Sequence, residues 1–136
     1  MSIAAVSIPL QASPSVPVLR VVSDEREWDA LEGEWNELFD ASPTASPPLR
    51  FEWLREWWRL FGPVYGDRGS GLRVYTVRRE SQLIGALPLY VGASSRLPMA
   101  PRRLGFLSTG EAEAEETCAT YLDLLHLPGA AAECLE

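Results

Sequence analysis

The sequence predicts a mixed α/β (α+β) domain in which two amphipathic helices pack on a largely antiparallel sheet. Apolar side chains recur at helical spacing over 24–39 and 51–61, which predicts two helices. Short alternating or continuous apolar runs at 72–78, 83–91 and 104–107 predict strands. The short turn between the first two of these runs predicts an antiparallel hairpin, and hence an antiparallel sheet around it.

A short strand and the first helix begin the predicted domain. Residues 17–22 (PVLRVV) have the composition of a strand. Asp24 is followed three residues later by Glu27, the spacing of a capping box, so the helix is expected to begin at Asp24. A single buried stripe is formed by Trp28, Leu31, Trp35, Leu38 and Phe39. Ser42-Pro43 ends this helix, and residues 41–48 form a loop.

The second helix is predicted over FEWLREWWRLFG, residues 51–62. Its charged residues fall on one face and are Glu52, Arg55, Glu56 and Arg59. Apolar side chains cover the rest of its surface, so the helix must be covered on most sides. Gly62-Pro63 combines a C-terminal glycine with a helix-incompatible proline and predicts the end of the helix.

The hairpin forms the centre of the predicted sheet. Residues 72–78 alternate between two faces, and residues 79–82 supply the turn. Residues 83–91 are apolar on both faces, which predicts a central strand. Because Pro88 cannot donate a ladder hydrogen bond, it predicts a bulge or an open edge beside it.

The last third of the chain is expected to complete the sheet. Residues 92–103 are predicted as a basic loop, 104–107 as a third sheet strand and 110–117 as an acidic loop or helical turn. Residues 121–127 predict another strand, and residues 128–136 a short helix. Because so short a helix is unstable alone in water, we expect either that it frays or that its partner surface belongs to a further part of the protein.

Two regions follow from this pattern. Residues 1–17, rich in Ser, Pro and Ala, predict a flexible leader. Residues 18–136 predict one lobe, truncated before a further domain. Apolar surface on the helix around Trp57 and an unfinished sheet edge then predict self-association of the isolated chain.

Composition excludes several classes of function. All 12 basic residues are arginines, which excludes chemistry that needs a lysine amine. The net charge of −7 opposes general nucleic-acid binding, although the basic segment 61–110 leaves open an anionic ligand or a solvated sheet face. No run reaches the ~20 apolar residues of a membrane span. Because a signal peptide is also lacking, we expect a cytoplasmic protein with two reduced thiols.

Three motifs suggest chemistry, and each has a stronger structural interpretation. Cys118 and His126 lie in an acidic segment that disfavours a thiolate, so they are interpreted as a small buried thiol and a strand histidine. Residues 102–107 (RRLGFL) partly match a pyrophosphate loop, but Leu107 is too large for its last position and acidic residues follow. The acidic run 111–116 lacks calcium-loop spacing, and no metal site is predicted.

The candidate binding residues are tryptophans and a Tyr–Asp pair. Helical spacing places the tryptophans in the core, but Trp53 and Trp58 need not both point inward. The alternative to the core is that the tryptophans line a sugar or acyl pocket, with both Trp53 and Trp58 as candidate substrate-binding residues. One of these two is also a candidate to face a partner domain. Tyr121 and Asp123, expected at the end of the last strand, are candidates to recognise a hydroxyl or amine group. Their structural alternative is a hydrogen-bonding pair that anchors a loop.

Several segments together resemble one family. They are WDALEGEWNEL, SPTASPPLRFEWL, EWWRLFG, VYTVRRESQLIGALPLY, RRLGFLSTGE and TYLDLL. In this order they resemble the N-terminal half of the CelD-like acetyltransferases of bacterial polysaccharide biosynthesis, a group of the GNAT (N-acetyltransferase) superfamily related to Fem-type aminoacyl transferases. The resemblance covers residues 18–136, and EWWRLFG and LIGALPLY are its most specific blocks.

The resemblance implies a GNAT-like lobe that packs against a C-terminal, CoA-binding GNAT domain and helps to shape an acceptor cleft. It implies acyl transfer by the complete protein from acetyl-CoA or another acyl-CoA to a small-molecule amine or hydroxyl acceptor, in polysaccharide or envelope metabolism. The matched blocks are not the catalytic ones, so no catalytic residue is assigned. We expect this chain alone to bind no acyl-CoA and to be inactive. The alternatives are a non-catalytic binding or scaffold module that uses the aromatic helix face, and a sugar-binding module.

Overall fold

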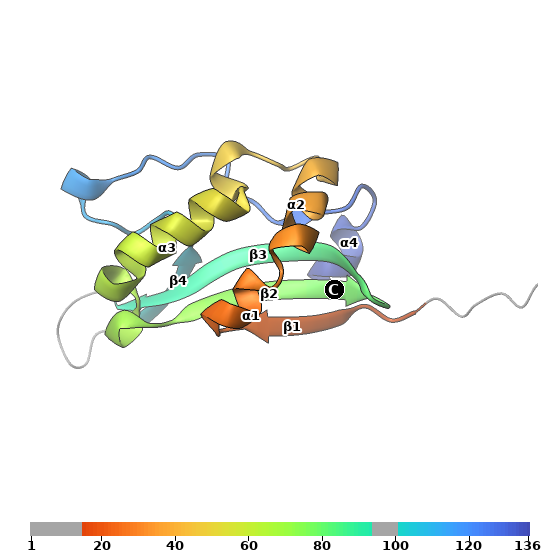
Figure 1. Ribbon diagram of the computed structural model, residues 1–136, viewed down its shortest axis with the longest axis horizontal. Coiled ribbons are helices and arrows are strands. Elements are labelled where there is room, and N and C mark those ends of the chain that lie inside the picture. The colour runs from red at the N-terminus through yellow and green to blue at the C-terminus, as the bar shows by residue number, and fades with distance from the viewer. Residues whose placement is uncertain (1–14, 94–100) are drawn as a thin grey trace, which may run out of the picture.

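The computed structural model describes residues 15–93 and 101–136, and it shows a mixed α+β fold in these ranges (Figure 1). The predicted α+β class and antiparallel sheet are therefore confirmed. Of the predicted leader 1–17, all but the last three residues lie outside the described residues. In chain order the main elements are β1 (Val18–Val22), α1 (Glu25–Asp29), α2 (Glu32–Ala41), α3 (Phe51–Tyr65), β2 (Leu72–Arg79), β3 (Gln82–Ala93), β4 (Arg102–Phe106), β5 (Leu125–His126) and α4 (Ala131–Leu135).

The sheet has the order β1-β2-β3-β4, and every pairing is antiparallel. The short strand β5 pairs with Gly85 and Ala86 of β3. The other side of β3 is thus shared by β5 and β4, which begins its pairing at Leu89. The predicted central position of this strand is confirmed. The register shifts between Val77 and Arg78 of β2, where Ile84 of β3 has no partner, so the bulge lies in β3 itself but four residues before Pro88.

Pro88 lies in the interval between β5 and β4. Its carbonyl accepts a hydrogen bond from the Leu107 N–H on that side (3.0 Å). In an extended strand the N–H and C=O of one residue point the same way, so the missing donor of Pro88 also faces this interval. No ladder bond is lost, because neither neighbouring strand pairs with Pro88 there.

The two faces of the sheet are covered unequally. Helices α1, α2 and α3 pack on one face, where the buried side chains of the sheet include Leu72, Val74, Ala86 and Tyr90 (Figure 1). The opposite side, here called the second face, is covered at one end by α4, through contacts of Ala130 with Val77 and Ile84. Since directly paired residues share a face, the register assigns further apolar residues to the second face. They are Leu19, Val21, Tyr75, Leu87, Leu89, Val91, Leu104 and Phe106.

The first predicted helix is divided into α1 and α2. Asp24 caps α1 as expected, since its Oδ1 accepts from the Glu27 N–H (3.0 Å). The chain then tightens at Leu31, whose N–H donates to the Trp28 carbonyl three residues back (2.9 Å). This turn lets Trp28 and Trp35 both become fully buried, with ring centroids 6.4 Å apart. The prediction of one continuous helix was wrong because packing of both rings favours the turn.

The third helix continues past its predicted end to Tyr65, so Gly62-Pro63 does not end it. A proline removes the hydrogen bond to the residue four positions earlier, here Arg59. Pro63 and Arg59 are both exposed, so water can satisfy the carbonyl that loses its partner. The Gly66 N–H donates to Gly62 O (2.9 Å) and closes the last turn.

The predicted strand over 121–127 was also wrong, except for its last residues, which form β5. Hydroxyl groups of the loop after α2 take hydrogen bonds that a sheet partner would otherwise take. The Oγ of Ser46 donates to the Tyr121 carbonyl (2.9 Å), and the His126 N–H donates to Ser42 Oγ (3.1 Å). One boundary also differs, since β4 takes in Arg102 and Arg103 from the predicted loop. The acidic run forms a single turn at Glu113–Glu115, which confirms the prediction of an acidic loop or helical turn.

Candidate functional site

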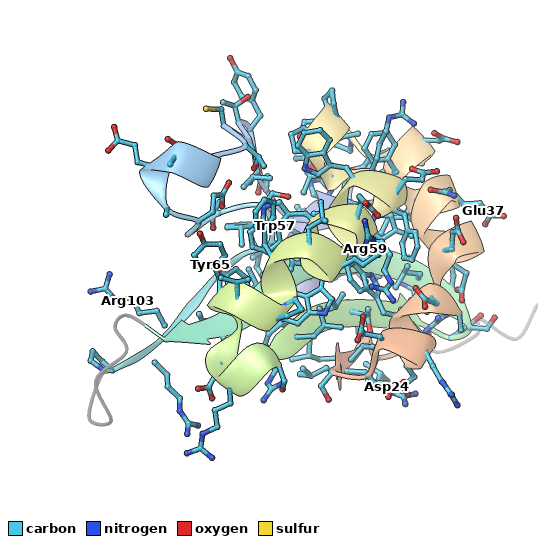
Figure 2. The ribbon with its side chains drawn as sticks, turned by 60° about the vertical axis from the view of Figure 1, so that its left-hand side comes forward. Asp24, Glu37, Trp57, Arg59, Tyr65 and Arg103 are labelled. Atoms are coloured by element: carbon cyan, nitrogen blue, oxygen red, sulfur yellow. The ribbon has the colours of Figure 1, made fainter. Side chains whose placement is uncertain are left out.

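A hollow of about 370 Å³ lies at the C-terminal end of α3, against the adjoining ends of β3 and β4. Its walls combine two phenols, one guanidinium and three glycines, from separate parts of the chain. Figure 2 shows Tyr65 at the end of α3 and Arg103 at the start of β4 on the same side of the molecule. The lining residues are Tyr65, Tyr90, Gly92, Arg103, Leu104, Gly105, Thr109 and Gly110.

The glycines make room for the tyrosines. A Cβ at Gly110 would stand 2.5 Å from the Tyr90 hydroxyl oxygen, and Gly110 has a φ of +88°, which other residues rarely adopt. A Cβ at Gly92 would stand 3.1 Å from both the Tyr65 carbonyl oxygen and the Tyr90 ring. Larger residues at these two positions would therefore displace the phenols or fill the hollow.

Both phenols are held by backbone groups. The Tyr90 hydroxyl donates to Thr109 O (2.5 Å), and the Tyr65 hydroxyl accepts from the Ala112 N–H (3.0 Å). Burial raises the pKa of Tyr90 to about 12, with smaller contributions from Glu111 and Tyr65. Tyr90 therefore keeps its proton into the alkaline range and is unsuited to act as a base. Because this proton is donated to Thr109 O, the Tyr90 hydroxyl is left to accept a hydrogen bond from a ligand.

A second hollow of about 330 Å³ lies on the other side of β4 and opens on the second face. Arg73, Arg102 and Arg103 surround it, and Tyr75, Val91 and Leu104 form its apolar part. Asp67 is the single acid in its lining, with its Oδ2 3.4 Å from Arg102 Nε. Arg103 and Leu104 line both hollows, so this end of the sheet presents positive charge on two sides.

The predicted Tyr121–Asp123 pair lies outside both hollows. Tyr121 is 86% exposed and has a φ of +58°, in a loop where a strand end was expected. Asp123 is exposed, and its Oδ1 accepts from the adjacent Leu124 N–H (2.7 Å). The Tyr121 carbonyl accepts from Ser46, so backbone bonding to the loop after α2 anchors this segment.

The two candidate tryptophans differ in burial, in agreement with the expectation that they need not both point inward. Trp58 is buried against Tyr90, with ring centroids 5.8 Å apart. Trp53 is 42% exposed, and its Nε1 donates to Ser108 Oγ (2.9 Å). Trp53 shares an exposed stripe of α3 with Leu60 and Val64, which follow it by seven and eleven residues and are 50% and 64% exposed. Trp53 is therefore the tryptophan available to a partner or ligand.

The sulfur and imidazole groups have separate surroundings. Cys118 is exposed, so its prediction as a buried thiol was wrong, and its Sγ lies 3.9 Å from the Glu116 carbonyl oxygen. His126 belongs to β5 as predicted for a strand histidine, and its Nδ1 lies 2.9 Å from the Leu127 carbonyl oxygen. Among the described residues, no three His, Cys, Asp or Glu side chains are grouped so that they could hold a metal ion.

This arrangement is suited to binding. A guanidinium, hydroxyl groups and a glycine-rich backbone can recognise hydroxyl-bearing or anionic molecules. Within residues 15–93 and 101–136, the first hollow brings together Arg103, Thr109 and the phenols of Tyr65 and Tyr90. The helices in these ranges are also too short or too polar to cross a membrane. Comparisons with protein-family models, curated proteins and solved structures find no significant match.

Proposed function

We propose that this chain is the N-terminal, acceptor-side lobe of an acyl-CoA-dependent N- or O-acyltransferase of the GNAT type, acting in bacterial polysaccharide or envelope metabolism. The sequence blocks EWWRLFG and LIGALPLY suggest the family. The observation that carries the acceptor role is the hollow at the end of α3. It offers Arg103 and phenol groups for recognition, while its most buried phenol, Tyr90, is held in the protonated form.

The exposed stripe of α3 is the proposed contact for the C-terminal GNAT domain. Trp53, Leu60 and Val64 lie on one side of the helix and expose apolar surface. Aromatic residues with a polar atom are favoured at interfaces because they bury a large area and still satisfy a hydrogen bond, as Trp53 does with Ser108. A non-catalytic scaffold module would use the same stripe to bind a different protein. This surface therefore supports both the acyltransferase lobe and the scaffold module.

Cofactor and acceptor binding can be tested separately on the purified chain. Titration with acetyl-CoA by calorimetry is expected to show no micromolar binding, since the cofactor belongs to the proposed second domain. A panel of amino sugars, neutral sugars and uronic acids, tested by ligand-observed NMR, is expected to give at least one millimolar binder. Arg103→Ala should weaken that binder at least tenfold, whereas Arg26→Ala, an exposed arginine of α1, should not.

Two results would contradict the proposal. Micromolar binding of acetyl-CoA would show that this chain holds the cofactor. An absence of any acceptor, or binding unaffected by Arg103→Ala, would remove the acceptor role and favour the scaffold alternative. For the translation product of the native gene, release of free CoA thiol in the presence of the same acceptor would then establish or refute the transferase activity.

A further inference from the structure

The second face of the sheet presents an apolar surface that α4 covers at one end only. Its outer strands contribute Leu19 (61% exposed), Val21 (42%) and Leu104 (52%). Between them lie the half-buried side chains of β2 and β3, including Tyr75 and Leu89. Four adjacent strands thus form one continuous patch, whereas apolar residues exposed singly need no partner.

The shape of this face suits a second sheet. A helix with its side chains is about 10–12 Å thick, and two stacked sheets are about 10 Å apart. The helix α4 therefore forms a step of the height that a stacked sheet requires. Four strands about 4.8 Å apart, each with about five residues rising about 3.4 Å, offer roughly 300 Å² in plan. Two such patches together bury roughly 600 Å², which is well below a standard interface, so the contact is expected to be weak and reversible.

The charges at the two ends of this face are complementary. Arg73, Arg102 and Arg103 lie around one end, where Asp67 is the single acid in the lining of the hollow. At the other end Glu133 belongs to α4, and Glu136 directly follows this helix. Glu133 is paired with Arg79, and Glu136 is exposed. A face with a positive and a negative end matches a second copy of itself turned end for end.

We propose that two copies of this chain associate through their second faces, about a twofold axis that runs between the sheets and across the strands. This axis places the arginine end of each copy against the α4 end of its partner. Each patch then lies between the two α4 helices, and the aligned stacking is that of a β-sandwich. The inference does not depend on the proposed acyltransferase role, since α3 takes no part in it, although Arg103 and Leu104 also line the hollow at the end of that helix.

Sedimentation equilibrium of the full chain between 5 µM and 1 mM tests this interface. We expect a monomer–dimer equilibrium with a dissociation constant of tens to hundreds of micromolar, weakened at least fivefold between 50 and 500 mM NaCl. Leu104→Glu on the second face should weaken dimerisation at least tenfold. Leu60→Glu provides a matched control, because Leu60 is 50% exposed but lies on α3. Circular dichroism confirms that each variant is folded.

A second pair of variants tests the orientation. Arg102→Glu and Glu136→Arg should each weaken the dimer, and the double variant should recover at least part of the loss, since opposite charges again meet across the twofold axis. A monomer at every concentration would overturn the proposal, as would disruption by Leu60→Glu instead of Leu104→Glu. Dimerisation without recovery in the double variant would overturn the end-for-end arrangement.

Discussion

Two buried tryptophans provide a matched test of one hydrogen bond. Trp28 and Trp35 are both fully buried and both contact the ring of Phe51 edge-on. They differ at the indole nitrogen. Trp35 Nε1 donates to the buried Leu49 carbonyl (3.0 Å), which connects α2 to the turn before α3. Trp28 Nε1 has no acceptor among the described residues. Substitution by phenylalanine removes the indole nitrogen in both cases.

The two substitutions therefore differ in free energy of unfolding. Each loses buried surface and leaves a small cavity, which costs about 1–2 kcal/mol in both variants. Trp35→Phe also leaves the Leu49 carbonyl buried without a donor, and such a group costs about 1–3 kcal/mol. Trp28→Phe instead removes a buried donor that has no partner, which offsets part of its packing loss. Arg55 lies 5.7 Å from the Trp28 ring, and losing this contact costs at most about 1 kcal/mol.

Urea denaturation followed by circular dichroism measures the difference. Trp35→Phe is expected to be less stable than Trp28→Phe by about 1–2 kcal/mol, with equal denaturant slopes. If Trp28→Phe proves equally or more destabilising, the reasoning is refuted. The two rings would then contribute through packing alone, and the bond to the Leu49 carbonyl would have no measurable net value.

Three further predictions concern titration and backbone space. Bonding to Arg78 lowers the pKa of Glu34. The ionised Glu34 therefore stabilises the fold fully above its unfolded pKa of 4.5, and this contribution is lost as the pH falls through the lower, folded pKa. Glu34→Gln should reduce the loss of stability that the protein shows between pH 5 and 3. Burial raises the pKa of Tyr90, so the protonated phenol contributes to folding stability below pH 10, and this contribution is lost as the pH rises toward 12. Tyr90→Phe should remove the late phase of an absorbance titration and lower the free energy of unfolding by about 1 kcal/mol. A Cβ at Gly85 would overlap the cysteine of α4, so Gly85→Ala should lower the free energy of unfolding, measured by urea denaturation, by about 1–3 kcal/mol. Gly33 lies in α2 with open space around it, so Gly33→Ala should raise this free energy by up to about 1 kcal/mol.

The sequence predicts the helices and the centre of the sheet because local periodicity determines them. The stripe from Trp28 to Leu38 and the alternation over 72–78 each require one buried side, and the structure buries that side in both elements. The boundaries were less predictable. Pro63 continues α3 because it lies on the exposed side of the helix, and a sequence pattern alone does not show whether water can reach a carbonyl.

The incorrect strand at 121–127 has a long-range cause. Side-chain hydroxyls of Ser42, Thr44 and Ser46, about 80 residues earlier in the chain, bond to the backbone of this segment. These contacts compete with sheet pairing, and no local pattern reveals them. The hollow was missed for a similar reason: Tyr65, Tyr90 and Arg103 come from three elements and share no motif spacing.

One segment of β3 contributes to both proposed surfaces, because successive side chains of a strand point to opposite faces. Tyr90 and Gly92 face the hollow at the end of α3, while Leu89 and Val91 belong to the second face. The two proposals should therefore separate by variant. Gly92→Ala places a methyl group 3.1 Å from the Tyr90 ring and should abolish acceptor binding without altering dimerisation. Leu19→Glu, on β1 and outside the lining of the hollow, should have the opposite effect. If either variant removed both properties, the two faces would be coupled through β3, and neither surface could be assigned from its own residues alone.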